Sequence, residues 1–134
     1  MGIYPVSRGT YSVTAMKNIT VKQTKELYSV GDLCLLAGIT RKTLFYYDRI
    51  DLLKPTCVRG TQNHKMYDRA KLEQLDQILQ YRKAGLRISE MKQLLNDTKD
   101  PEAVLKTALK RLTEEKRKKE EEIQVLTELI MNAG

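Results

Sequence analysis

The chain has 134 residues, of which 41% are hydrophobic and 31% are charged, and its formal net charge is +7. This length fits one compact domain plus an appendage, and the composition is that of a soluble globular protein. No apolar run approaches the roughly eighteen residues that a transmembrane helix needs. The N-terminal segment also lacks the apolar core of a signal peptide. We therefore expect a cytoplasmic protein.

Residues that could bind a metal or catalyse a reaction are few. The chain has one histidine, His64, and two cysteines, Cys34 and Cys57, which form no CxxC pair. A structural zinc or iron–sulfur site needs about four such ligands, so neither a metal nor a cofactor is predicted. With no paired carboxylates in an apolar setting and no Gly-rich phosphate loop, an enzyme is not expected. Cys34 is predicted to lie in the core; Cys57 is interpreted as an incidental thiol, with a redox sensor as the alternative.

Positive charge is concentrated in the N-terminal half. Residues 1–27 and 28–70 each have a net charge of +3, whereas residues 71–100 have six basic and five acidic residues and residues 101–134 have seven of each. Such an excess would attract a polyphosphate, with an affinity set largely by counterion release. It would equally keep a small protein in solution. Charge alone does not decide between these interpretations.

Two short helices are predicted after residue 28. The first begins at Ser29, whose hydroxyl can accept from the Asp32 amide, and ends at Gly38 in a left-handed cap. Thr40 caps the second, which runs through residue 50 and has two inward residues, Leu44 and Tyr47. Two short capped helices joined by three residues have the spacing of a helix-turn-helix.

A small hairpin and two further helices follow. Residues 56–67 form a short two-stranded wing, because turn residues lie at its centre, from Gly60 to Asn63. Asp68 caps a third helix that Gly85 closes, with an apolar face of Leu72, Leu75, Ile78 and Leu79. Ser89 is expected to cap a fourth, short helix that buries Met91, Leu94 and Leu95.

The last helix begins at Asp100-Pro101-Glu102, a capping aspartate followed by proline at the first helical position. Residues on one stripe are spaced alternately by four and three, as in a heptad seam: Leu105, Leu109, Leu112, Lys116, Lys119, Ile123, Leu126 and Ile130. Thirty helical residues span roughly 45 Å, too long for a small domain to cover. We expect a second copy of the chain to cover the seam, with the helix folding back on its own domain as the alternative.

Lys116 and Lys119 interrupt this seam at its middle. In a parallel pair Lys116 would face its own copy, whereas an antiparallel pair can place both lysines near the acids of residues 120–122. An antiparallel coiled coil is therefore favoured. The predicted dimerisation residues are Leu105, Leu109, Leu112, Ile123, Leu126 and Ile130.

The order of elements and several motifs resemble the MerR family of bacterial transcription regulators. The motifs are Tyr28-Ser29-Val30-Gly31-Asp32-Leu33, Ala37-Gly38-Ile39-Thr40, Thr43-Leu44-Phe45-Tyr46-Tyr47-Asp48 and Leu52-Leu53-Lys54-Pro55. The resemblance implies a mainly α fold. Its parts are a winged helix-turn-helix domain at 28–97 and a dimerisation helix at 100–132. Residues 1–27 lie outside the family pattern and show no steady period, so we expect an extended or poorly ordered N-terminal extension there.

The second helix is then the recognition helix of the motif, and its first turn reaches base edges in the major groove. Arg41 and Lys42 are expected there because arginine and lysine can donate to guanine. The resemblance also implies that one of the paired tyrosines reaches phosphate while the other packs, and we expect Tyr46 to contact DNA and Tyr47 to be partly core. Tyr67 is expected either to pack on the third helix or to touch phosphate. The expected DNA-binding residues are Thr40, Arg41, Lys42, Thr43, Tyr46, Tyr47, Arg59, His64, Lys65 and Tyr67.

Two positions depart from the family pattern. The family usually has arginine where this chain has Phe45, and Gly-Tyr-Arg in the wing where this chain has Asn63-His64-Lys65. Lys65 keeps the positive charge but lacks the planar fork of arginine. We expect the contacts with DNA to differ from those of relatives at these positions.

The resemblance implies a homodimer that binds and distorts promoter DNA so that RNA polymerase can use it. A coiled-coil adaptor for another protein, or an architectural DNA binder without effector sensing, is the alternative. An adaptor would need no basic helix-turn-helix, and an excisionase-like binder would lack the long terminal helix. No effector site is visible in the sequence.

Overall fold

The computed structural model describes residues 26–134, and the expectation for 1–27 lies almost entirely outside this range. The fold is mainly helical with one small sheet, as predicted. The elements follow in the order β1 (Leu27–Ser29), α2 (Val30–Ala37), α3 (Arg41–Arg49), β2 (Cys57–Arg59), β3 (His64–Asp68), α4 (Arg69–Lys83), α5 (Ile88–Leu95) and α6 (Pro101–Ala133). Over this range no helix combines the length and apolarity needed to cross a bilayer.

Helices α2 and α3 form the predicted helix-turn-helix. The Ser29 hydroxyl accepts from the Asp32 amide at 3.0 Å, and the Asp32 carboxylate accepts from the Ser29 amide at the same distance. Gly38 ends α2 with a φ of 68°, a conformation that favours glycine because it has no Cβ. Thr40 then caps α3. These local bonds fix where each helix begins and ends.

The predicted two-stranded wing is present as β2 and β3, and a third strand that was not predicted extends it into an antiparallel sheet of order β1-β3-β2. β2 and β3 pair as expected, with Val58 opposite Lys65. The third strand, β1, pairs with the other edge of β3 and sets Tyr28 opposite Tyr67. Three residues are too few to show a strand period, which is why the sequence did not reveal β1. Its effect is to tie the start of α2 to the wing.

The core lies between the sheet, the helix pair and α4. Asp68 caps α4 by accepting from the Lys71 amide at 2.9 Å, as predicted. Leu79, predicted on the inward face, is only partly buried. Side chains from α2, α3, the Leu52-Leu53 turn, β3 and α4 form the most buried set: Leu33, Leu44, Leu53, Tyr67, Leu72, Leu75 and Ile78. We call residues 27–95 the head.

Helix α5 begins two residues earlier than predicted, and Ser89 does not cap it. Its N-cap is Arg87, whose amide donates to Glu90 Oε1 at 2.7 Å. The Glu90 carboxylate thus accepts the Arg87 amide at the start of α5, while Ser89, the expected cap, is exposed in the first turn. Met91 is buried, whereas Leu94 and Leu95 are partly buried.

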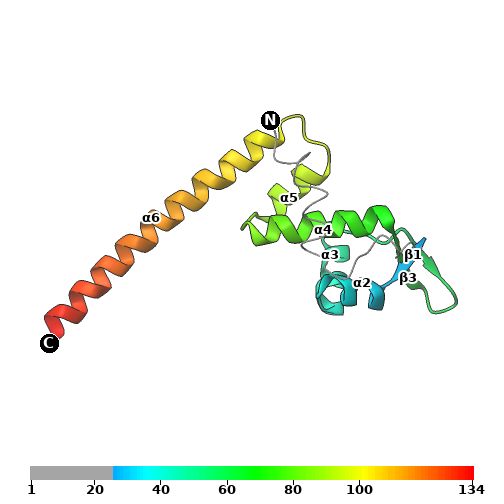
Figure 1. Cartoon of the computed structure of the whole chain (residues 1–134), viewed down its shortest axis with the longest axis horizontal. Helices are drawn as coiled ribbons and strands as arrows, with labels where there is room; N and C mark the ends of the chain where they lie inside the picture. The colour runs from blue at the N-terminus through cyan, green and yellow to red at the C-terminus, as the bar shows by residue number, and fades with distance from the viewer. Residues whose placement is uncertain (1–25) are drawn as a thin grey trace.

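Helix α6 leaves the head and projects away from it over most of its length (Figure 1). It begins as predicted, with Asp100 accepting from the Ala103 amide at 3.0 Å and Pro101 in the first turn. Its first turns pack on α5, where Ala108 is 2% exposed. From Thr113 onward every residue is exposed. One long helix therefore has two environments within a single chain.

Candidate nucleic-acid interface

Helix α3 carries a basic first turn on a well-anchored base. Leu44 is fully buried and Tyr47 is 4% exposed, so they hold the inner face of α3 against the core. Arg41 and Lys42 are exposed on the outside, as predicted. The arrangement presents two cations from a rigid helix, which suits recognition in a DNA groove.

The hydroxyls of Thr40 and Thr43 are engaged in the cap of α3. Thr40 Oγ1 accepts from the Thr43 amide at 3.1 Å and lies 3.1 Å from Thr43 Oγ1. Both were predicted as short DNA contacts. One of the two hydroxyls donates to the other, so their hydrogen-bonding capacity is partly used within the chain.

A groove separates the first turns of α2 and α3 from the wing. The guanidinium of Arg41 lies over Gly31, where an added Cβ would be 3.3 Å from Arg41 Nη2. The lack of a side chain at Gly31 thus leaves room for Arg41 at the groove. Its lining contains four basic or imidazole side chains and several neutral ones: Ser29, Val30, Gly31, Arg41, Phe45, Arg59, Gln62, Asn63, His64, Lys65 and Met66.

The paired tyrosines point in different directions, as adjacent residues on a helix must. Tyr46 is 39% exposed, and the Arg49 guanidinium lies 5.2 Å from its ring centroid. Tyr47 is in the core, and its hydroxyl accepts from Arg82 Nη1 at 3.0 Å. Tyr46 is therefore the accessible member of the pair, and Tyr47 anchors α3 to α4.

The wing offers two exposed groups and one that is paired. Arg59 and His64 are exposed on β2 and β3. Lys65, expected as a DNA clamp, places its ammonium 2.7 Å from Asp48 Oδ2 on α3 and 4.7 Å from the Phe45 ring centroid. The sequence did not reveal this contact, because Asp48 and Lys65 belong to different elements and share no local pattern.

Asp48 receives two lysines. Its Oδ1 lies 2.8 Å from Lys54 Nζ, which also donates to the Asp48 carbonyl at 2.9 Å. Hydrogen bonds from Lys54 and then from Lys65 hold the pKa of Asp48 below its usual value. The carboxylate therefore stays ionised at neutral pH and neutralises part of the positive charge of this face.

Tyr67 is fully buried, so its burial favours packing over a phosphate contact. Burial, and to a smaller extent the nearby Asp48 and Cys34, raises the pKa of Tyr67 to about 12. Within residues 26–134 its hydroxyl has no hydrogen-bond partner. Tyr67 and Tyr47 thus both belong to the support of the surface rather than to the surface itself.

The two cysteines are both free thiols. Cys34 packs against the core, and desolvation there raises its pKa, although Arg41 opposes the shift. Cys57 is exposed at the start of β2. In the described part of the chain, no cluster of three metal-binding side chains was found.

The predicted dimerisation residues fall into two groups along α6. Leu105 and Leu112 are half-buried, and Leu112 lies beside Gly85 of the head, 3.5 Å from where a Cβ would be. Leu109, Ile123, Leu126 and Ile130 are between 58% and 67% exposed. The alternative of folding back on its own domain thus applies to the first turns of α6 alone.

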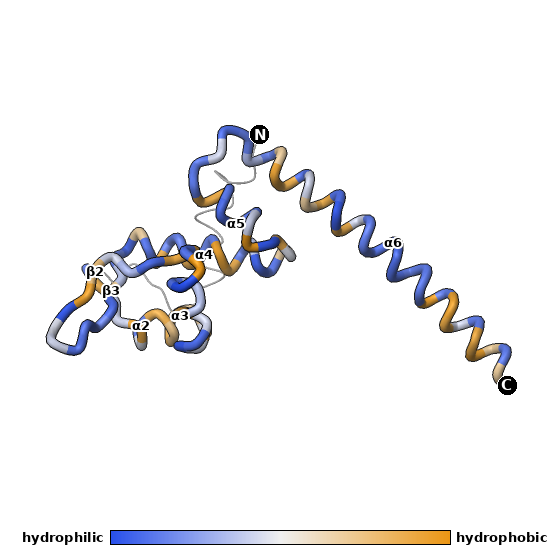
Figure 2. The backbone as a smooth tube through the Cα atoms, turned by 180° about the vertical axis from the view of Figure 1, so that it is seen from behind, coloured by the Kyte–Doolittle hydropathy of each residue, from blue (hydrophilic) through white to orange (hydrophobic). Residues whose placement is uncertain are grey.

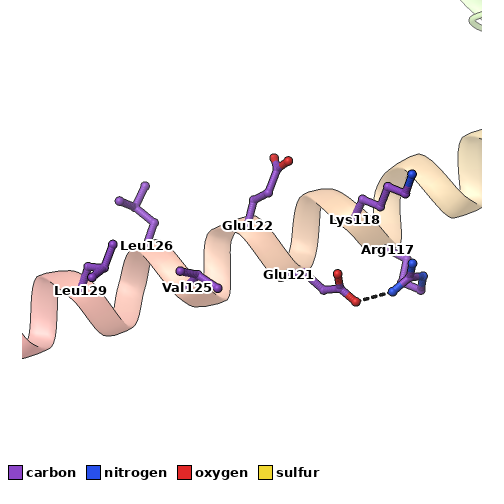
Figure 3. Close-up of a pocket in the computed structure, with 7 residues that line it drawn as sticks. All are labelled: Arg117, Lys118, Glu121, Glu122, Val125, Leu126 and Leu129. Carbon is purple, nitrogen blue, oxygen red and sulfur yellow. Dashed lines mark hydrogen bonds and ion pairs between the residues drawn. The ribbon is translucent and has the colours of Figure 1, made fainter.

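Beyond the head the surface of α6 changes from charged to apolar, as Figure 2 shows along the helix. Arg117 pairs with Glu114 at 2.6 Å and with Glu121, and Lys119 pairs with Glu122 at 3.1 Å. Figure 3 shows charged and apolar side chains succeeding one another on adjoining turns: Arg117, Lys118, Glu121, Glu122, Val125, Leu126 and Leu129. The end of the helix thus exposes a stripe of large aliphatic side chains.

Comparison with known proteins supports the family resemblance. The HTH-type transcriptional activator TipA of Streptomyces coelicolor is 44% identical over 80 residues, which are 59% of this chain and 31% of TipA. The HTH-type transcriptional activator mta of Bacillus subtilis is 30% identical over 106 residues, 78% of this chain and 41% of mta. The chain therefore spans less than half the length of these two relatives.

A solved structure has the same architecture. The N-terminal part of the Bacillus subtilis multidrug transporter activator, MtaN, superposes with a TM-score of 0.68 at 31% identity, covering 77% of this chain and 97% of that one. The sequence profile of the MerR HTH family regulatory proteins matches residues 28–98, from the β1 strand to just beyond α5. The winged helix-turn-helix, the long helix and this match together show that the chain belongs to the MerR family of helix-turn-helix regulatory proteins.

Proposed function

We propose that this chain is a cytoplasmic, non-enzymatic transcription regulator that binds promoter DNA as a homodimer. The observation that carries the proposal is the exposed pair Arg41 and Lys42 on the first turn of α3, next to the groove that Arg59 and His64 line from the wing. A helix of this width fits the major groove while the wing follows the backbone. The relatives TipA and mta are named transcriptional activators, which agrees with this role.

Homodimerisation is the second part of the proposal. The seam residues Ile123, Leu126 and Ile130 expose large aliphatic side chains that the chain's own head does not cover. Burying such surface against a second copy is favourable by about 25 cal/mol per Å². An antiparallel arrangement places the lysines of one helix near the acids of the other and sets the two heads apart.

Membership of the MerR family also supports a mechanism in which the dimer distorts promoter DNA. In the proposed mechanism the dimer grips two half-sites, distorts the DNA between them and thereby realigns the promoter elements for RNA polymerase. Bending costs on the order of 1–6 kcal/mol, which several phosphate and base contacts per head can offset. Energy transfer between dyes at the two ends of an operator would report the distortion.

The test of DNA recognition begins with selection of bound sequences from random DNA by the full chain. Arg41→Ala with Lys42→Ala should then weaken binding to the selected site by at least about tenfold, since each base contact contributes about 1–3 kcal/mol. Lys106→Ala with Lys110→Ala is the matched control, because it removes the same charge from exposed positions on α6. Equal effects of the two pairs would mean that only net charge matters. Selection of no sequence at all would favour a coiled-coil adaptor.

The test of dimerisation is sedimentation of the full chain. Leu126→Glu with Ile130→Glu should convert the dimer to a monomer, because both side chains lie on the seam. Gln124→Glu, an exposed position off the seam, adds charge to the same part of α6 and should leave the dimer intact. A monomeric wild-type chain would contradict the proposed interface.

A further inference from the structure

The two departures from the family pattern contact each other. Phe45 on α3 and Lys65 on β3 lie with the Lys65 ammonium 4.7 Å from the centroid of the Phe45 ring. The same ammonium is 2.7 Å from Asp48 Oδ2, one helical turn along α3 from Phe45. The other oxygen of Asp48 is 2.8 Å from Lys54 Nζ. We call Phe45, Asp48, Lys54 and Lys65 the wing tie.

The wing tie leaves Lys65 poorly suited to bind a phosphate. Its side chain is 34% exposed and the Asp48 side chain 15% exposed, so their ion pair is partly shielded from water. To reach a phosphate, Lys65 would have to leave both the carboxylate and the aromatic face, each of which attracts a cation. Arg59 and His64 on the same wing are exposed and face no such cost.

The same contacts join the wing to the recognition helix. β3 is held to the head by its pairing with β1 and by the buried ring of Tyr67, which lies two residues beyond Lys65. The wing tie adds a side-chain link from β3 to α3, the helix that carries Arg41 and Lys42. The angle between helix and wing therefore depends on a carboxylate that lies between two lysines.

We infer that Asp48 is a positioning residue that fixes the wing against the recognition helix by holding Lys65 over Phe45, and that Lys65 acts through this link and not as a phosphate contact. The inference rests on the proposed DNA-binding function. It assigns the phosphate contacts of the wing to Arg59 and His64.

The salt dependence of operator binding separates a positioning lysine from a phosphate contact. Each phosphate contact contributes about 0.9 to the slope of log K against log salt concentration. Lys65→Met should weaken binding by about tenfold, equivalent to about 1.4 kcal/mol, without changing this slope. Arg59→Met is the matched control on the same wing and should lower the slope by about 0.9 for each bound head.

Two results would overturn the inference. One is a Lys65→Met slope reduced as much as that of Arg59→Met, which would make Lys65 a phosphate contact. The other is a Lys65→Met protein that binds the operator as wild type does, which would leave the link without effect on recognition.

Hydrogen exchange in the free protein tests the link without DNA. In Asp48→Asn the amides of the wing, including the Thr56 amide that donates to the Met66 carbonyl at 2.8 Å, should exchange faster while those of α4 do not change. Unchanged exchange in the wing would show that the wing tie does not hold the wing in place, even if DNA binding is established. Conversely, if no operator can be selected, the proposed function fails and the exchange experiment still decides whether the tie exists.

Discussion

Arg111 is the residue through which we expect the orientation of α6 to be most easily disturbed. It donates to Glu90 Oε1 at 2.7 Å and to the Gly85 carbonyl at 3.4 Å, and its side chain is only 18% exposed. Beyond this contact, residues 113–133 are exposed and extend about 30 Å at 1.5 Å per residue. A tilt of about 10° at the contact would thus move the far end by about 5 Å.

The perturbation is Arg111→Met, which keeps the aliphatic stem and removes the charge. The Glu90 side chain, 12% exposed, then keeps the Arg87 amide as a hydrogen-bond donor but loses its guanidinium. Losing a charged partner at such a site costs about 1–3 kcal/mol, which urea unfolding can measure. Lys110→Met is the control, because it removes the same charge from an exposed neighbouring position.

In the proposed dimer the two heads are held apart by the two α6 helices, so a looser junction changes the distance between half-sites. A displacement of about 5 Å corresponds to between one and two base pairs at about 3.4 Å each. We expect Arg111→Met to bind operators over a broader range of spacings while preferring the same half-site sequence. The assay is binding to a panel of operators that differ only in spacing. A spacing profile identical for Arg111→Met, Lys110→Met and wild type would refute the reasoning.

Two further predictions concern the support of the α3 surface. Tyr67→Phe removes a buried hydroxyl that has no partner within residues 26–134. The substitution should leave operator affinity unchanged and should leave the free energy of unfolding unchanged or raise it by up to about 1 kcal/mol. Weaker DNA binding would show that the hydroxyl reaches a phosphate. Asp48 has a lowered pKa, so its stabilising effect is full above the unfolded value of about 3.9 and is lost as pH falls through the lower folded value. The free energies of unfolding of wild type and Asp48→Asn should therefore differ most above about pH 5 and converge in acid. A difference that does not depend on pH would contradict this prediction.

The helices could be predicted from the sequence because their ends are fixed by local chemistry. Ser29, Thr40, Asp68 and Asp100 each accept a backbone amide three residues ahead, and this relation is visible in the sequence itself. The error at Ser89 has the same origin. Ser89 and Glu90 are adjacent acceptors, and the longer side chain of Glu90 reaches back to the Arg87 amide.

Contacts between distant residues could not be predicted in this way. The pairing of Leu27 with Asp68 joins strands that lie far apart in the sequence, and the three residues of β1 carry no period of their own. Among the site residues, the positions of Arg41 and Lys42 followed from the helix, but the ion pair of Lys65 with Asp48 did not. Counting charges therefore identified the basic face but overestimated how many of its cations have no acidic partner within the chain.

Helix α6 shows how one heptad pattern can serve two partners. The pattern of large apolar residues runs from Leu105 to Ile130, but a buried residue outside it, Ala108, marks where the head packs. Ala108 lies in the first turns of α6, which pack on α5, whereas the aliphatic residues after Lys119 are exposed. The heptad spacing alone does not distinguish the part of the helix that packs on the head from the part that is exposed. The distinction rests on Ala108 and on Gly85 beside Leu112. Leu105 and Leu112 are half-buried, whereas Leu109 and the seam residues after Lys119 are exposed and remain available to the proposed dimer interface.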